Sequence, residues 1–131
     1  VYERYGENAA MFLDEKLIET LNVIREQILC APMTVNNWHA GGNFTQRGLR
    51  CNICELVKSK TDAGRLYLSA HMLGKAVDCN VEGMTAEEAR RLIIAKQELL
   101  PYPIRLEDGV SWLHFDLYKN GKNEKVYLFK A

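Results

Sequence analysis

Residues 104–118 of the chain read IRLEDGVSWLHFDLY, a stretch in which two runs of alternating apolar residues flank a turn sequence. The segment 108–111 contains the Asp-Gly pair that hairpin turns favour, so we predict a strand on each side of it. Because side chains alternate between the two faces of a strand, one apolar set lies on one face and one polar set on the other. The apolar set must pack against a core.

Two amphipathic helices are predicted outside this hairpin. Between about residues 8 and 30, apolar side chains recur every three or four positions. This stripe consists of Leu13, Leu17, Leu21, Ile24 and Ile28. Thr85 and Glu88 have the spacing of a capping box at the start of the second helix, and Pro101 ends it. Its buried stripe is predicted to be Ala89, Leu92, Ile93 and Leu99.

Two further extended runs, 76–81 and 126–129, complete the predicted sheet, and Asn120-Gly121 is expected to form a second hairpin turn. Residues 34–60 are rich in Gly, Asn and isolated aromatic residues and are predicted to form a long loop of functional importance. Helices packed against a small antiparallel sheet make an α+β fold. A chain of 131 residues has the size of one domain, so we predict a single domain.

Composition and charge exclude several classes of partner. Apolar residues make up 47% and charged residues 26%, the usual mix of a soluble globular protein. Lys+Arg and Asp+Glu balance at 17 each, so no nucleic-acid partner is expected. No segment has the roughly 18 apolar residues needed to span a bilayer, so no membrane partner is expected, and we predict a monomer. Residues 1–8 do not resemble a secretory signal, which favours synthesis in the cytoplasm and release by other means; a trimmed secreted protein is the alternative.

The chain has four cysteines. Cys51 and Cys54 have the spacing of a zinc knuckle, but a structural zinc site usually needs a second such pair, and the sequence has none. Cys30 and Cys79 are flanked by apolar residues and are predicted to be buried thiols. We expect all four to be reduced and structural, because the chain is long enough to fold without disulfides. A redox-active Cys51–Cys54 pair is the alternative.

The polar faces of the predicted strands carry residues of chemical interest. Alternation gathers four of them on the face opposite the apolar set: Asp78, Glu107, His114 and Asp116. Carboxylates and an imidazole on one face are the usual components of a metal site. His71 is a further candidate ligand, since it precedes the strand that carries Asp78, and Gly74 between them lets the chain bend close to a ligand. Three such protein ligands leave a fourth tetrahedral position on zinc open to water.

The run 69–78, SAHMLGKAVD, resembles the SxHxxGxAxD motif of zinc D-alanyl-D-alanine carboxypeptidases and related peptidoglycan endopeptidases. The run 112–116, WLHFD, resembles the second histidine strand of that family, and residues 48–51, GLRC, are similar to its Gly-Tyr-Arg-Ser stretch. These pieces occur in the family's order and span most of the domain. The resemblance implies the fold that these peptidases share with the hedgehog signalling domain, and one zinc ion per chain held by His71, Asp78 and His114.

The resemblance also implies hydrolysis of peptide bonds in bacterial peptidoglycan stem peptides, by a carboxypeptidase or an endopeptidase. Many members place a catalytic Asp or Glu three residues before the second histidine, where this chain has Ser111. Hedgehog-like relatives instead carry a glutamate at the end of the preceding strand. Glu107 occupies that place and is favoured as general base over Asp108. If neither acts, the domain is a non-catalytic zinc-containing module that binds peptidoglycan or a protein partner.

Several other side chains are expected near the substrate. Arg50 corresponds to the family's substrate-facing arginine, and its guanidinium suits a substrate carboxylate or a developing oxyanion. Ser69 is expected to form a hydrogen bond near the site, with a role in a turn as the alternative. Trp38 and His39 are predicted to line the cleft, although His39 is also consistent with a structural or surface position. Asp116 either orients a metal ligand or is solvated.

Overall fold

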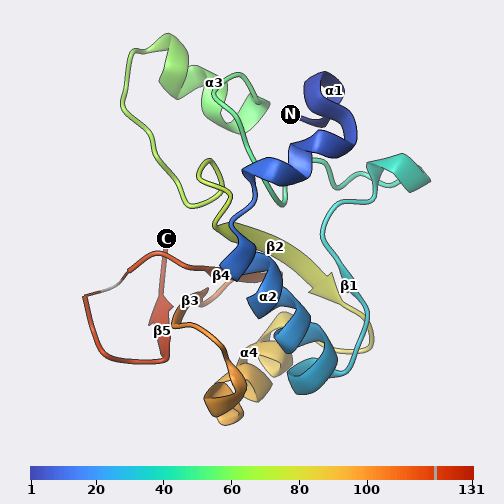
Figure 1. Ribbon diagram of the computed structural model, residues 1–131, viewed down its shortest axis with the longest axis vertical. Helices are drawn as coiled ribbons and strands as arrows, with labels where there is room; N and C mark the ends of the chain where they lie inside the picture. Colours follow the sequence, from blue (N-terminus) through green and yellow to red (C-terminus); the bar gives the residue numbers. More distant parts are fainter. Residues whose placement is uncertain (120) are drawn as a thin grey trace.

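The structure, a computed structural model, describes residues 1–119 and 121–131 (Figure 1). Its elements follow in the order α1 (Tyr2–Tyr5), η1 (Gly6–Phe12), α2 (Glu15–Val23), η2 (Ile24–Leu29), β1 (Met33–Thr34), η3 (Trp38–Ala40), α3 (Glu55–Asp62), β2 (Ala76–Val81), α4 (Ala86–Ala95), η4 (Gln97–Leu99), β3 (Ile104–Glu107), β4 (Leu113–Asp116) and β5 (Val126–Phe129). Helices and a five-stranded sheet confirm the α+β class.

The sheet has the strand order β1-β2-β4-β3-β5. The predicted hairpin of β3 and β4 is present, and the pairings β1–β2 and β2–β4 are also antiparallel, although β1 was not predicted as a strand. β5 runs parallel to β3, so the sheet is mixed rather than antiparallel as expected. β4 cannot also pair with β5, because β3 and β2 already occupy its two edges. Therefore β4 and β5 do not form the second hairpin that was expected. The turn of this hairpin was predicted at Asn120-Gly121, of which Asn120 lies outside the described residues.

The hairpin of β3 and β4 presents its apolar side chains to the core, as alternation predicted. Leu106, Leu113 and Phe115 are fully buried and join a cluster with residues of β2, α2, η2 and α4. Each such side chain contributes about 1.5–3 kcal/mol by its removal from water. The polar residues of the same strands are thereby held on the opposite face of a rigid sheet.

The first predicted helix is divided into three parts. Residues 6–12 form a 3₁₀ helix, the α-helix begins only at Glu15, and residues 24–29 form a π-helix. The Asp14 carboxylate accepts a hydrogen bond from the Lys16 N–H at 2.9 Å and thus caps α2. Leu17, Ile24 and Ile28 of the predicted stripe are buried, whereas Leu13 and Leu21 are partly buried. Cys30, predicted to be buried, is exposed, while Cys79 is buried; all four thiols are free.

The predicted capping box of α4 is confirmed: the Thr85 hydroxyl accepts from the Glu88 N–H, and the Glu88 carboxylate accepts from the Thr85 N–H. The predicted buried stripe is wrong in part, since Leu92 and Leu99 are 36% and 41% exposed. Leu99 belongs to η4, where the helical phase is broken. Arg90 is buried in place of these leucines.

Arg90 is buried because its guanidinium satisfies backbone carbonyls of the turn between β3 and β4. It donates hydrogen bonds to the carbonyl oxygens of Glu107, Val110 and Trp112 at 3.3, 3.1 and 3.3 Å. It also pairs with the Glu87 carboxylate at 3.2 Å. Arg90 therefore ties α4 to the hairpin that carries one of the candidate metal ligands.

The predicted loop of residues 34–60 contains an unpredicted helix, since α3 begins at Glu55. Val57 is the only residue of α3 that is buried, which explains why no apolar stripe indicated this helix in the sequence. Residues 35–54 follow an irregular path apart from the short turn η3. Among the described residues, no helix is both long and apolar enough to cross a bilayer.

Candidate metal centre

Three predicted ligands come together on the polar side of the sheet. Asp78 in β2 and His114 in β4 are directly paired across the antiparallel ladder, and His71 lies in the turn that leads into β2. One potential ligand atom from each residue lies within 4.8 Å of the others, and all three residues are buried. This confirms the prediction from strand parity that a histidine and an aspartate face one site, and it shows that His71 joins them.

Gly74 holds the turn that carries His71 against the N-terminal segment. Its φ is +65°, and a Cβ atom at this position would lie 2.0 Å from the carbonyl oxygen of Phe12. The Asp14 N–H donates to the Gly74 carbonyl at 3.0 Å on the same side. Glycine is thus required for a close backbone approach, as predicted, but the approaching group is a protein backbone rather than a ligand.

Each histidine is oriented by a partner on the ring nitrogen that faces away from Asp78. Nδ1 of His71 lies 2.8 Å from the carbonyl oxygen of Gly48, which can only accept a hydrogen bond, so Nδ1 carries the proton. Nε2 of His114 lies 3.3 Å from Oδ2 of Asp116. When each ring is neutral, its remaining nitrogen has a lone pair directed into the cluster.

Asp116 is itself fixed by several donors, which settles its role between the two alternatives. It is 1% exposed. The Arg105 guanidinium donates to its two oxygens at 2.8 and 2.7 Å, and the Tyr118 N–H donates to Oδ1 at 2.8 Å. Asp116 is therefore not a solvated strand residue but the carboxylate that orients His114, as in metal sites where a carboxylate supports a histidine ligand.

The charges of the cluster are strongly coupled. Burial alone would raise the pKa of Asp78, but hydrogen bonds from His114 and His71 and their charges outweigh it and hold that pKa well below its usual range. Burial opposes the charged form of His114, yet the carboxylates of Asp116 and Asp78 raise its pKa to about 9. Nδ1 of His114 lies 2.6 Å from Oδ1 of Asp78, so in the metal-free protein a proton lies between them. The two carboxylates therefore favour a positive charge on His114.

The donor set is chemically suited to a divalent transition metal. Two imidazole nitrogens and one carboxylate oxygen are ligands that zinc accepts, and three protein ligands leave a position open. Neutral imidazoles and one carboxylate would leave a divalent ion with a net single positive charge. The supporting hydrogen bonds from Gly48 and Asp116 are those that a histidine ligand normally needs. The residues present therefore fit a metal ion.

Arg50 is brought to the cluster by the chain segment that precedes α3. Its Nη2 donates to Oδ2 of Asp78 at 3.1 Å, and its Nε donates to the carbonyl of Gln46 at 2.9 Å. Its backbone N–H donates to the carbonyl of His71 at 3.2 Å. The predicted substrate-facing arginine thus lies beside the candidate metal ligands, where it contacts one of them directly.

The Ser69 side chain has an unusual environment. Its Oγ is buried and has no hydrogen-bonding partner among residues 1–119 and 121–131. Its backbone carbonyl accepts from the N–H groups of Met72 and Leu73, so the residue also helps to form the turn that carries His71. The expected side-chain hydrogen bond near the site is therefore not found among the described residues, whereas the alternative role in the turn agrees with the contacts of the backbone carbonyl.

The two candidate general bases differ in their surroundings. The β3–β4 register pairs Leu106 with Phe115, and its continuation by one position puts Glu107 opposite His114. Within the described part of the chain, the half-buried Glu107 carboxylate has no hydrogen-bonding or ionic partner. Asp108 faces Lys130, with Oδ2 and Nζ 3.7 Å apart. Neither residue belongs to the metal-binding group.

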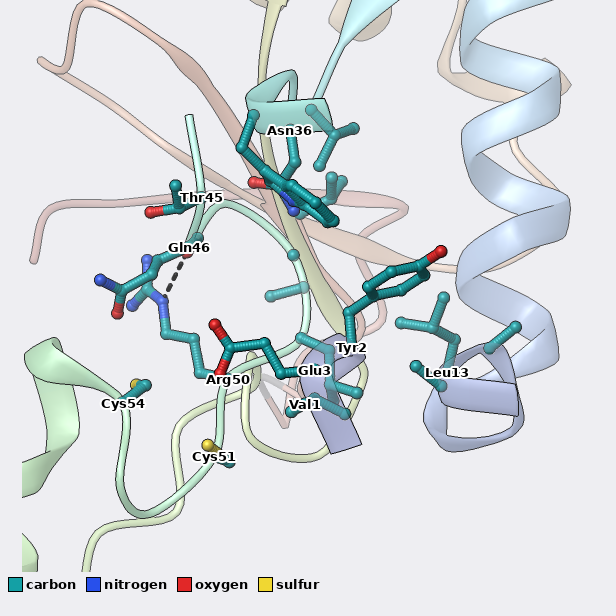
Figure 2. Close-up of a pocket in the computed structure, with 18 of the residues that line it drawn as sticks. Val1, Tyr2, Glu3, Leu13, Asn36, Thr45, Gln46, Arg50, Cys51 and Cys54 are labelled. Carbon is teal, nitrogen blue, oxygen red and sulfur yellow. Dashed lines mark hydrogen bonds between the residues drawn. The ribbon is translucent and has the colours of Figure 1, made fainter. Parts of the chain in front are cut away.

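Trp38 and His39 lie in η3, at a distance along the chain from the cluster. Their rings are in edge contact, with centroids 5.8 Å apart, and Trp38 also contacts the Tyr2 ring at 5.2 Å. Trp38 lines a cavity of about 730 Å³ between the N-terminal segment and residues 35–54 (Figure 2). Arg50 and Gly48 line the same cavity, so it adjoins the cluster without including the three ligands.

Sequence reasoning missed several residues that support the site. Arg105 could have been found, because Arg105 and Asp116 lie opposite each other in the predicted hairpin. The ring of Phe129 packs against that of His114 with centroids 5.8 Å apart, but the parallel pairing of β5 that brings it there was not predicted. Gly48 acts through its carbonyl, for which no side-chain pattern exists.

Comparisons of this chain with protein-family models, with curated proteins and with solved structures found no match.

Proposed function

We propose that this protein is a zinc-dependent hydrolase of peptide bonds, with the ion held by His71, Asp78 and His114. The observation that carries the proposal is the convergence of these three buried side chains. Each imidazole is also oriented by a second partner, the Gly48 carbonyl for His71 and the Asp116 carboxylate for His114. A structural zinc site usually has four protein ligands, whereas three protein ligands leave one position on zinc free for water or substrate. A zinc ion bound there would lower the pKa of a water molecule toward about 7 and polarise a carbonyl group.

Glu107 is the proposed general base. Its predicted place opposite His114 in the strand register, together with its unpartnered carboxylate, favours it over Asp108, which is close to Lys130. Glu107 would accept a proton from the attacking water and return it to the leaving amine. Asp108 remains the second candidate for this step.

Arg50 and Ser69 are the proposed substrate-binding residues. Arg50 has guanidinium N–H groups beyond those that contact Gln46 and Asp78, and these would hold a substrate carboxylate or stabilise the developing oxyanion. The Ser69 hydroxyl, which is buried and has no partner in the described chain, would reach the same substrate only if the turn around it opened. Trp38 and His39 stay as predicted contributors to the cleft wall.

For the substrate we propose stem peptides of bacterial peptidoglycan, cut by a carboxypeptidase or an endopeptidase reaction. The support is the resemblance of residues 69–78, 112–116 and 48–51 to zinc peptidases of that kind. The residues that the resemblance implies as ligands are the three that lie together in the cluster, which supports the metal site but not the choice of substrate.

Digestion of purified muropeptides tests this proposal. We expect new amines, detected by mass spectrometry, that disappear when a chelator is added and return when zinc is restored. Glu107→Gln should lose at least about 100-fold in turnover while it retains zinc, because general acid–base catalysis contributes about 10²–10⁴-fold. Asp108→Asn is the matched control and should keep most of its activity. Near-normal turnover of Glu107→Gln with lost activity of Asp108→Asn would transfer the role to Asp108.

A non-catalytic zinc-containing module that binds peptidoglycan or a protein is the second candidate. Ser111 favours it, since this exposed serine stands where many similar peptidases have their acid or base. The same digest separates the two functions. A zinc-loaded protein that co-sediments with peptidoglycan but releases no amine would support the binding module.

A further inference from the structure

The segment 46–51 forms a wall between the metal-ligand cluster and the cavity of about 730 Å³. On one side it supplies the Gly48 carbonyl to His71, and the Arg50 side chain to Asp78. The Arg50 N–H also donates to the backbone carbonyl of His71. Anything that fixes or distorts this segment must therefore affect the positions of two candidate ligands.

The segment continues into a tight turn with a cysteine at each end. The N–H of Cys54 donates to the carbonyl of Cys51 at 3.2 Å, a hydrogen bond that closes a four-residue turn. In such turns the first and fourth Cα atoms lie less than about 7 Å apart, and a disulfide needs a Cα separation of about 4.4–6.8 Å. Backbone geometry in this turn is thus compatible with a disulfide between Cys51 and Cys54.

Both thiols are free and accessible. Cys51 and Cys54 are partly exposed and both line the cavity, with Arg50 on the same side and Leu13 on the opposite side (Figure 2). The cavity opening gives a small reagent access to either sulfur. The remaining thiols differ in this respect, because Cys79 is fully buried, whereas Cys30 is exposed but has no second cysteine in its turn.

We propose that Cys51 and Cys54 form a reversible dithiol–disulfide site that reacts with small-molecule disulfides and, when oxidised, locks the segment 46–51 against the metal-ligand cluster. One cysteine thiolate attacks a sulfur of the small disulfide, which forms a mixed disulfide and releases one small thiolate. The second cysteine thiolate then attacks the protein sulfur of the mixed disulfide and releases the other small thiolate. The two cysteines are oxidised, the small disulfide is reduced to two thiols, and these take up the two protons that the cysteines lose.

The lock acts by removing freedom from a short segment. Closing a loop of four residues lowers the conformational entropy of the unfolded chain and reduces its equilibrium unfolding constant by up to about 20-fold. The Arg50 N–H that bonds to His71 lies one residue before the ring, so its hydrogen exchange should slow by at most this factor, when exchange requires the segment and the turn to open together. This effect is independent of whether the protein hydrolyses any bond.

Treatment of the full chain with oxidised glutathione tests the site. In a Cys30→Ser background, which removes the other exposed thiol, we expect the intact mass to fall by two hydrogen atoms, a proteolytic peptide that links Cys51 to Cys54, and reversal by reduced glutathione. Cys51→Ser and Cys54→Ser should each stop at a single glutathionyl adduct. The wild type is the matched control and should form the same Cys51–Cys54 link, with at most one further glutathionyl adduct, on Cys30. Hydrogen exchange at Arg50, followed by NMR in the reduced and oxidised forms, measures the lock.

Four outcomes would overturn the inference. Wild-type protein that carries glutathione on both Cys51 and Cys54 would show that the ring does not close. A link to Cys30, or no reaction at either cysteine of the turn, would contradict the assignment of the site. A disulfide that forms without any change in Arg50 exchange would contradict the lock. All these readouts are independent of zinc content and turnover.

Discussion

Replacement of Asp116 by Asn is the most informative perturbation of the site, because it leaves the three candidate ligands in place. The Asp116 carboxylate accepts from Nε2 of His114 at 3.3 Å and from the Arg105 guanidinium at 2.8 and 2.7 Å. An amide keeps one acceptor oxygen and presents an NH₂ group in place of the other. If that oxygen stays with Arg105 and the Tyr118 N–H, the amide nitrogen faces the His114 N–H, and two donors oppose each other.

The expected result is weaker metal binding. Loss of a carboxylate that supports a histidine ligand typically costs about 10–100-fold in affinity. This corresponds to about 1.4–2.8 kcal/mol of binding free energy. The loss of negative charge also removes part of the attraction between the site and a cation, which acts in the same direction.

Competition with a fluorescent zinc chelator at fixed pH measures this affinity. Circular dichroism and urea unfolding of the metal-free variant establish that it is folded. Asp108→Asn is the matched control, since it removes a carboxylate that follows the neighbouring strand β3 and lies near Lys130 rather than in the cluster. A zinc affinity of Asp116→Asn within about twofold of the wild type would refute the reasoning.

Three further predictions concern stability. Gly74→Ala should lower the free energy of unfolding by about 2–4 kcal/mol in urea, because the new Cβ is strained at positive φ and would lie 2.0 Å from a backbone carbonyl oxygen. Gly83→Ala is the control, since Gly83 has φ +74° but open space around it and should lose only the part due to strain. Equal losses in the two variants would contradict this account. Arg90→Met should cost about 2–4 kcal/mol because buried carbonyls lose their donor, whereas exposed Arg91→Met should change stability by less than about 0.5 kcal/mol. In the metal-free protein the pKa of His114 is about 9, above its ordinary value of 6.5, so protonated His114 stabilises the fold fully below pH 6.5 and this stabilisation is lost as the pH rises through 9. Thermal melts in the presence of a chelator should show a melting temperature that falls over this pH range. A melting temperature that does not fall would contradict the prediction.

Local pattern was sufficient to predict two of the three candidate ligands. Period-two alternation put Asp78 and His114 on one face, and this is robust because a shift of one residue would expose Leu113 and Phe115. The apolar stripe of α2 and the capping box of α4 were predictable for the same reason, since both depend on residues at most four positions apart. The sequence also indicated a close approach at Gly74, but the approaching group, the Phe12 backbone, was not predicted.

Features that depend on distant residues were not predictable. The parallel pairing of β5 follows from the occupied edges of β4, which no local pattern reveals. α3 has a single buried residue, Val57, and therefore lacks a periodic signal. The charge of Arg90 suggested an exposed side chain. The side chain is buried instead, because it donates hydrogen bonds to backbone carbonyls about twenty residues away in the sequence.

Anomalous diffraction at the zinc absorption edge, from crystals of protein exposed to equimolar zinc, tests the central claim most directly. The account predicts one peak per chain, at direct bonding distance of roughly 2 Å from His71, Asp78 and His114, and loss of that peak in His71→Ala. A peak held instead by Cys51 and Cys54, or a wild-type crystal in which the three side chains bind no ion, would contradict it.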